Sequence, residues 1–140
     1  MCGGSEKDIY DPNRFGALAV LSVTSGVEQD LSGQLLFFNE SHHESSVATH
    51  VRYIPTGYHP LNEDLILTIF CTGDLTIPPA QCKQLESFTL SETESRLGQQ
   101  LLLHVGGSGI IGRRIAISSS GFPQSSVAEG IVGFNHGLIA

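Results

Sequence analysis

The feature that most constrains this chain is a succession of short apolar or alternating runs, separated by clusters of glycine, proline, serine, asparagine and aspartate. Runs of this length between turn-forming residues are typical of strands. Eight such strands without a convincing helix predict a sandwich or barrel. One alternative stays open, a helical turn near residues 80–83. The eight runs cover residues 16–24, 31–38, 46–54, 64–71, 84–90, 98–105, 113–118 and 127–134.

Length and composition favour one globular domain. The chain has 140 residues, of which 40% are hydrophobic and 15% are charged. A chain of this size buries a core without help from metals or disulfides. Residues 1–15 are polar, and we expect them to form a flexible N-terminal extension. Residues 16–140 are expected to form the sandwich domain.

The charge and the cysteines bear on partners and location. A formal net charge of −7 argues against nucleic-acid binding, because phosphates repel an acidic surface. No apolar run is long enough to span a membrane, and the polar N-terminus does not resemble a signal peptide. We therefore expect a cytoplasmic protein. Three cysteines form neither a disulfide framework nor a zinc set, although a Cys71–Cys82 bridge stays open.

Four segments, taken in order, resemble the Cu/Zn superoxide dismutase family. Residues 17–38 are similar to the opening hairpin, and LILTIFCTGD at 65–74 lies where the family has "H-G-F-H-V-H-E-F-G-D". The most specific likeness is GIIGRRIAI at 109–117, which resembles "I-I-G-R-x-[LM]-V-V-H". AEGIVGF at 128–134 is similar to the closing "A-C-G-V-I-G-I". The resemblance implies an eight-stranded antiparallel Greek-key β-sandwich or barrel with shortened metal-binding and electrostatic loops.

The same alignment implies that the catalytic residues are lost. Thr68, Phe70 and Ser118 stand at copper-ligand positions, and neither Thr nor Phe supplies the nitrogen that copper sites require. Glu129 replaces the cysteine of the family's disulfide, and Ser126 replaces its guiding arginine. The chain between Asp74 and the next strand contains no histidine. We therefore expect a non-catalytic member without cofactors, similar to virus-encoded superoxide dismutase-like proteins.

Three alternatives remain at this point. The first is a metal-handling protein that binds copper through surface histidines, with His42, His43 and His50 as candidate ligands. For His42 and His43, a solvated turn is a simpler interpretation than a metal site, because the two residues are adjacent in a polar segment. The second is a residual superoxide dismutase, and the third is an unrelated all-β protein.

The resemblance also indicates an interface. In the family the "I-I-G" loop and the C-terminal strand help to form a twofold dimer, and a homodimer is therefore expected here. The other partners that it suggests are a superoxide dismutase subunit or its copper chaperone. The candidate interface residues are apolar and suit a self-complementary patch, and they are Ile110, Ile111, Phe134, Leu138 and Ile139.

Overall fold

The computed structural model describes residues 16–23, 31–41, 45–56, 64–78, 81–119 and 127–135. These ranges contain eight strands and no α-helix, and thus no helix that could cross a membrane. The predicted extension at 1–15 lies outside them, as do His42, His43, Ser126, Leu138 and Ile139. The strands are β1 (Ala17–Val23), β2 (Gly33–Phe38), β3 (Val47–Pro55), β4 (Leu65–Phe70), β5 (Gln84–Leu90), β6 (Glu94–Leu102), β7 (Arg114–Ser119) and β8 (Val127–Phe134).

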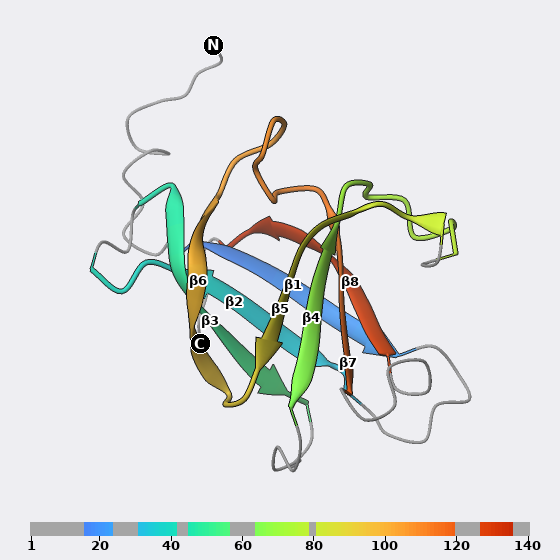
Figure 1. Cartoon of the computed structure of the whole chain (residues 1–140), viewed down its shortest axis with the longest axis horizontal. Coiled ribbons are helices and arrows are strands. Elements are labelled where there is room, and N and C mark those ends of the chain that lie inside the picture. The colour runs from blue at the N-terminus through green and yellow to red at the C-terminus, as the bar shows by residue number, and fades with distance from the viewer. Residues whose placement is uncertain are drawn as a thin grey trace.

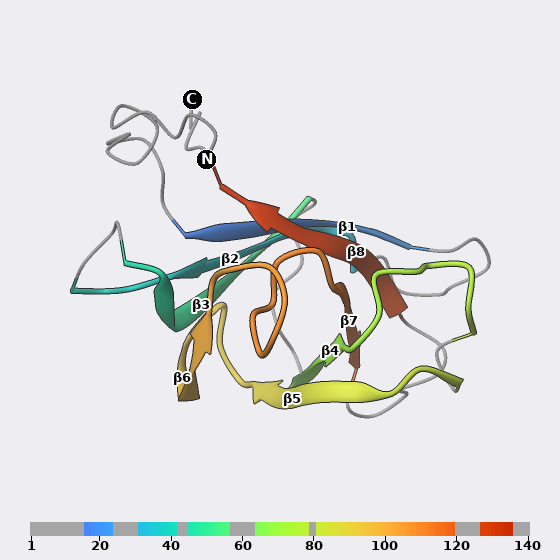
Figure 2. The ribbon, with the colours of Figure 1, turned by 90° about the horizontal axis from the view of Figure 1, so that it is seen from above.

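The strands form one antiparallel sheet that curls into a nearly closed barrel. Their order is β5-β4-β7-β8-β1-β2-β3-β6. Seen from above, β8, β1, β2 and β3 form one layer, and β7, β4 and β5 lie below it (Figure 2). The two end strands, β5 and β6, come together at one side of the barrel (Figure 1). The all-β prediction is confirmed at this level.

The core lies between the layers, and strand periodicity explains its membership. Side chains alternate between the two faces of a strand, so every second residue points inward. In β4, Leu65, Leu67 and Ile69 are almost fully buried, while Ile66 and Thr68 are only partly covered. Burying one such aliphatic side chain contributes roughly 1.5–3 kcal/mol. Inward residues of the other strands join the same cluster, among them Ala19, Leu21, Leu35, Phe37, Ile115, Ile117 and Val132.

The observed strand bounds follow the predicted runs closely, with one exception. The sixth run was expected at 98–105, whereas β6 spans Glu94–Leu102. Its polar first residues join the strand because they pair with β3, Glu94 opposite Arg52 and Arg96 opposite His50. This pairing lies far apart in sequence and is invisible to local hydrophobicity. Near the helical turn considered at 80–83, the structure has a 3₁₀ turn at Gln81, whose N–H donates to the Pro78 carbonyl at 2.9 Å, and β5 begins at Gln84.

Candidate functional site

The outer face of β4 and β7 carries the three residues that the resemblance led us to expect at copper-ligand positions. Thr68 pairs with Ala116 and Ile66 pairs with Ser118 across these two neighbouring strands. Thr68, Phe70 and Ser118 therefore lie on one face, opposite the core. The structure brings the three predicted positions together, but none of them carries an imidazole.

Arg114 of β7 dominates this face. Its side chain is only 1% exposed, which is rare for arginine and requires compensating partners. The guanidinium binds the carboxylate of Glu129 on β8, with Nε–Oε2 and Nη2–Oε2 distances of 2.7 and 2.6 Å. Its central carbon also lies 5.5 Å from the ring centre of Phe70, within the range of a cation–π contact. Phe70 and Arg114 thus fill the outer face with packed side chains.

The loop between β4 and β5 is tied to this ion pair. Arg114 Nη1 donates to the carbonyl oxygens of Ile77 at 2.5 Å and Asp74 at 3.2 Å. The same nitrogen lies 3.5 Å from Cys82 Sγ. A single guanidinium therefore connects β7, β8 and the loop. We call Arg114, Glu129 and Phe70 the arginine clamp.

Arg113, next in the chain, anchors a second loop on the other side of β7. Its three guanidinium nitrogens each donate to a backbone carbonyl, those of Gly109, Cys71 and Gly107, at 2.6–2.7 Å. Gly112 before it has a φ of 87°, a left-handed conformation that costs glycine little. Arg113 thus holds the loop before β7 and also the first residue of the β4–β5 loop, which Arg114 contacts further along the chain.

Asp74 begins the turn that the arginine clamp holds. The Thr76 hydroxyl donates to its Oδ1 at 2.6 Å and the Thr76 backbone N–H does so at 2.9 Å. These two hydrogen bonds favour the ionised form and lower the pKa of Asp74 below its ordinary value, and the charge of Arg114 acts in the same direction. Asp74 is therefore an acceptor in a local turn.

The metal-ligating residue types do not converge here. Within the described residues, no three His, Cys, Asp or Glu side chains gather closely enough to hold a metal ion. Cys71 and Cys82 are both free thiols. Cys82 Sγ faces the carbonyl oxygens of Pro78 and Ile77. The chemistry that this face offers is charge pairing and packing.

His50 is the one candidate surface ligand that the structure describes. Its ring is largely buried and stacks on Phe38, with the ring centres 5.5 Å apart. Nδ1 lies 2.8 Å from the Thr49 hydroxyl, and Nε2 lies 3.8 Å from the Glu40 carboxylate. Nδ1 therefore has a hydrogen-bond partner within the protein, while Nε2 lies beyond hydrogen-bond distance of Glu40.

The candidate interface residues fall into two groups. Ile110 is fully buried and Ile111 is 7% exposed, and both belong to the core cluster. Phe134, at the end of β8, is 37% exposed. The homodimer stays a prediction. Ile110 and Ile111 offer a partner less exposed apolar surface than we expected from the sequence.

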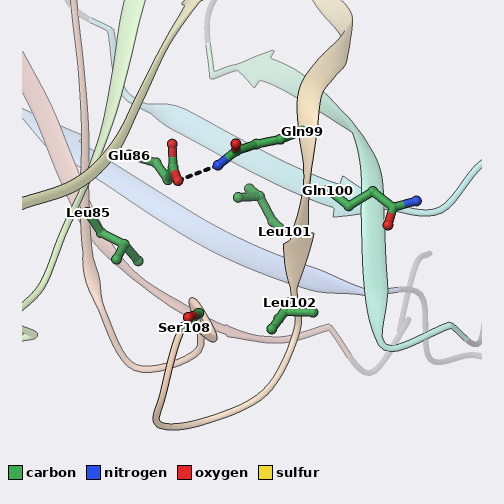
Figure 3. A pocket seen from close by; sticks show the side chains of 7 residues that line it. All are labelled: Leu85, Glu86, Gln99, Gln100, Leu101, Leu102 and Ser108. Carbon is green, nitrogen blue, oxygen red and sulfur yellow. Dashed lines mark hydrogen bonds between the residues drawn. The ribbon is translucent and has the colours of Figure 1, made fainter.

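A pocket between β5 and β6 was not foreseen from the sequence. Its volume is about 240 Å³, and it lies where the two end strands meet. Gln99 and Leu101 point from β6 toward Leu85 and Glu86 of β5, while Gln100 points the other way (Figure 3). A hydrogen bond from Gln99 Nε2 to Glu86 Oε2 crosses the pocket. Leu102 and Ser108 complete the lining.

The pocket exists because no ladder of backbone hydrogen bonds closes the barrel between the described strands β5 and β6. Within the described residues, β5 pairs only with β4 and β6 only with β3. The only sequence signals for it are Leu85, between the polar residues Gln84 and Glu86, and the run of leucines that begins at Leu101. Those signals have no meaning until the two strands are known to be neighbours.

No protein-family model and no curated protein sequence matches this chain.

Proposed function

We propose that this protein is a non-catalytic binding or structural module built on a Greek-key sandwich of the Cu/Zn superoxide dismutase type. The strand order supports the fold part of the proposal. In a Greek key, a fourth strand returns to lie beside the first of three consecutive strands. The strand β7 returns to lie beside β4, after β5 and β6 have followed β4 in the chain.

The observation that carries the functional part is the arginine clamp. In the family to which the resemblance points, copper ligands and a disulfide cysteine occupy the positions of Phe70 and Glu129. Here a ring and an ion pair fill these positions, and Arg114 is almost completely buried between them. A buried arginine that already has a carboxylate and two carbonyl partners repels a metal cation. The proposal therefore excludes copper chemistry at this face.

The arginine clamp also takes the structural role that the disulfide has in the superoxide dismutase family, which is to tie a loop to a strand. Glu129 of β8 and the loop at residues 74–82 are held together through Arg114, without a covalent bond. Free Cys71 and Cys82 agree with a reducing compartment, and a cytoplasmic location is part of the proposal. The proposed partners are a second copy of the chain, a superoxide dismutase subunit or its copper chaperone.

Metal analysis and an activity assay test the proposal. The protein is purified with copper and zinc in excess, and bound metal is measured together with superoxide-dependent activity. We expect less than one tenth of a metal ion per chain and no activity above that of the buffer. One copper per chain with superoxide turnover would falsify the proposal and support the alternative that the protein is a residual superoxide dismutase.

A second candidate function, metal handling, is favoured by the imidazole–carboxylate pair of His50 and Glu40. Copper titration of the protein and of a His42→Ala/His43→Ala/His50→Ala variant separates the two candidates. Stoichiometric binding that the triple variant loses supports metal handling. Equal binding by both proteins, or none by either, removes it.

A further inference from the structure

We infer that the seam between β5 and β6 binds an extended peptide that carries an apolar anchor side chain flanked by basic residues. This inference rests on the proposed binding function and names the surface and the partner for it. By the seam we mean the facing edges of β5 and β6 together with the pocket between them.

The seam selects an extended chain because it offers free strand edges. The structure pairs β5 with β4 alone and β6 with β3 alone among the described strands, and no backbone hydrogen bond joins β5 to β6. Each strand therefore turns one edge of N–H and C=O groups toward the seam, apart from the Leu102 carbonyl, which already accepts a hydrogen bond from the Ile110 N–H. An added strand satisfies such groups through main-chain hydrogen bonds, which is how peptide-binding sheets gain affinity.

The pocket selects the anchor by size and character. A volume of about 240 Å³ lies below the range of roughly 300–1,000 Å³ that is usual for sites of drug-sized ligands. It suits a single apolar side chain. Leu85 and Leu101 form apolar walls, and Leu101 belongs to the buried core, so the pocket opens directly onto packed aliphatic surface (Figure 3).

Charge selects the flanking residues. Among the seven residues that line the pocket, Glu86 is the only charged one. The turn between β5 and β6 and the start of β6 carry two further acidic residues, Glu92 and Glu94, and one basic residue, Arg96. Glu94 is already paired with Arg52. A partner with Lys or Arg beside its anchor therefore gains from attraction to Glu86.

The same charges disfavour a second copy of this chain as the occupant. The chain has a formal net charge of −7, and a symmetric contact through the seam brings Glu86 of both copies together. Like charges placed across an interface oppose association. The partner is thus a different, basic segment.

The test uses acetylated and amidated hexapeptides of sequence Lys-Thr-X-Thr-Val-Lys, with Leu, Met, Phe or Val at X. Binding is measured by calorimetry, and backbone amide shifts locate the site. We expect saturable binding by at least one peptide, with the shifts concentrated in β5 and β6. Replacing both Thr by Pro removes two N–H donors and should abolish binding, and replacing both Lys by Glu should do the same.

Two variants of the protein and one control locate the site. Leu102→Lys places a cation at the pocket rim, where Leu102 is 36% exposed, and should weaken binding at least tenfold. Glu86→Gln keeps a side chain that can bond Gln99 and should weaken binding about tenfold, equivalent to about 1.4 kcal/mol. Val20→Lys makes the same chemical change on β1, at a residue that is 59% exposed, and should leave binding unchanged.

The outcomes separate this inference from the proposed function. Absence of saturable binding by all four peptides overturns the inference, while the metal and activity measurements stand independently. Equal weakening by Leu102→Lys and Val20→Lys also overturns it. So does a concentration-dependent dimer whose amide shifts lie in β5 and β6, because a second copy then occupies the seam.

Discussion

Nη2 of Arg114 lies 2.6 Å from Oε2 of Glu129, and the arginine side chain is almost completely withdrawn from solvent. The two residues face each other across β7 and β8, where Ala116 pairs with Glu129 and Arg114 pairs with Ile131. The carboxylate is 20% exposed, so the pair lies at the boundary of the covered face. Its two strong bonds, and those to the loop carbonyls, offset the cost of burying the charge.

Removing the carboxylate should destabilise the protein strongly. Glu129→Ala leaves a buried guanidinium without its counter-ion, and breaking such a pair costs about 3–5 kcal/mol. Urea unfolding followed by circular dichroism measures the change. The matched control is Glu94→Ala, whose pair with Arg52 is 43–47% exposed and contributes no more than about 1 kcal/mol. Equal losses in the two variants would contradict the role of the arginine clamp.

Replacing the whole pair should be less harmful than breaking it. Arg114→Met combined with Glu129→Leu removes both charges and keeps apolar volume beside Phe70. Such exchanges are often neutral or stabilising for buried pairs. We expect the double variant to recover most of the stability that Glu129→Ala loses. Hydrogen exchange should nevertheless increase at residues 74–78, since the carbonyl oxygens of Asp74 and Ile77 lose a donor.

The three carbonyl contacts of Arg113 predict that lysine is a poor substitute. A lysine ammonium is a compact charge without the planar fork of a guanidinium, so it cannot reach Gly107, Gly109 and Cys71 together. Bonds to a charged group contribute about 1.5–3 kcal/mol each, and Arg113→Lys should cost about 2 kcal/mol. Arg96→Lys, on exposed β6, serves as the control and should change stability by less than about 0.5 kcal/mol. If Arg113→Lys lost no more stability than Arg96→Lys, the contacts of Arg113 would be dispensable.

The strands were predictable from the sequence because their signal is local. Alternation places Leu65, Leu67 and Ile69 on one side of β4 whatever the neighbouring strand is. The arginine clamp was not predictable, because Arg114 and Glu129 meet only once the β7–β8 register is known. Glu129 drew attention in the sequence only through the resemblance, which places it where that family has a cysteine, and the ion pair that it forms depends on the tertiary structure.

The pocket at the seam, like the arginine clamp, could not be predicted from the sequence. A pocket between β5 and β6 depends on how far the sheet curls, which is set by twist and by side-chain packing over all eight strands. No segment of the chain encodes it alone. Conversely, Ile110 and Ile111 look like interface residues in sequence, and their burial follows from the path of the loop before β7.

A buried tyrosine provides a test of the core next to β2. The Tyr53 hydroxyl donates to the Leu31 carbonyl at 2.8 Å, and both residues are buried. Tyr53→Phe keeps the ring and leaves the carbonyl without this donor, at a cost of about 1–3 kcal/mol. The slope of the urea transition should stay the same, because the buried area hardly changes. An unchanged midpoint would mean that this hydrogen bond contributes nothing to folding.

The Asp74–Thr76 turn makes a prediction about acid stability. Because hydrogen bonds lower the pKa of Asp74 in the folded protein, its carboxylate adds stability above the unfolded pKa of about 3.9. That contribution is lost as the pH falls through the lower, folded pKa. Thr76→Val removes the hydroxyl donor, so it should raise the pKa of Asp74 toward its ordinary value and flatten the decline of stability below about pH 4. Carboxyl NMR titration measures the pKa, and Thr89→Val, at an exposed position of β5, is the control. An unchanged Asp74 titration in Thr76→Val would show that the hydroxyl bond does not act on this group.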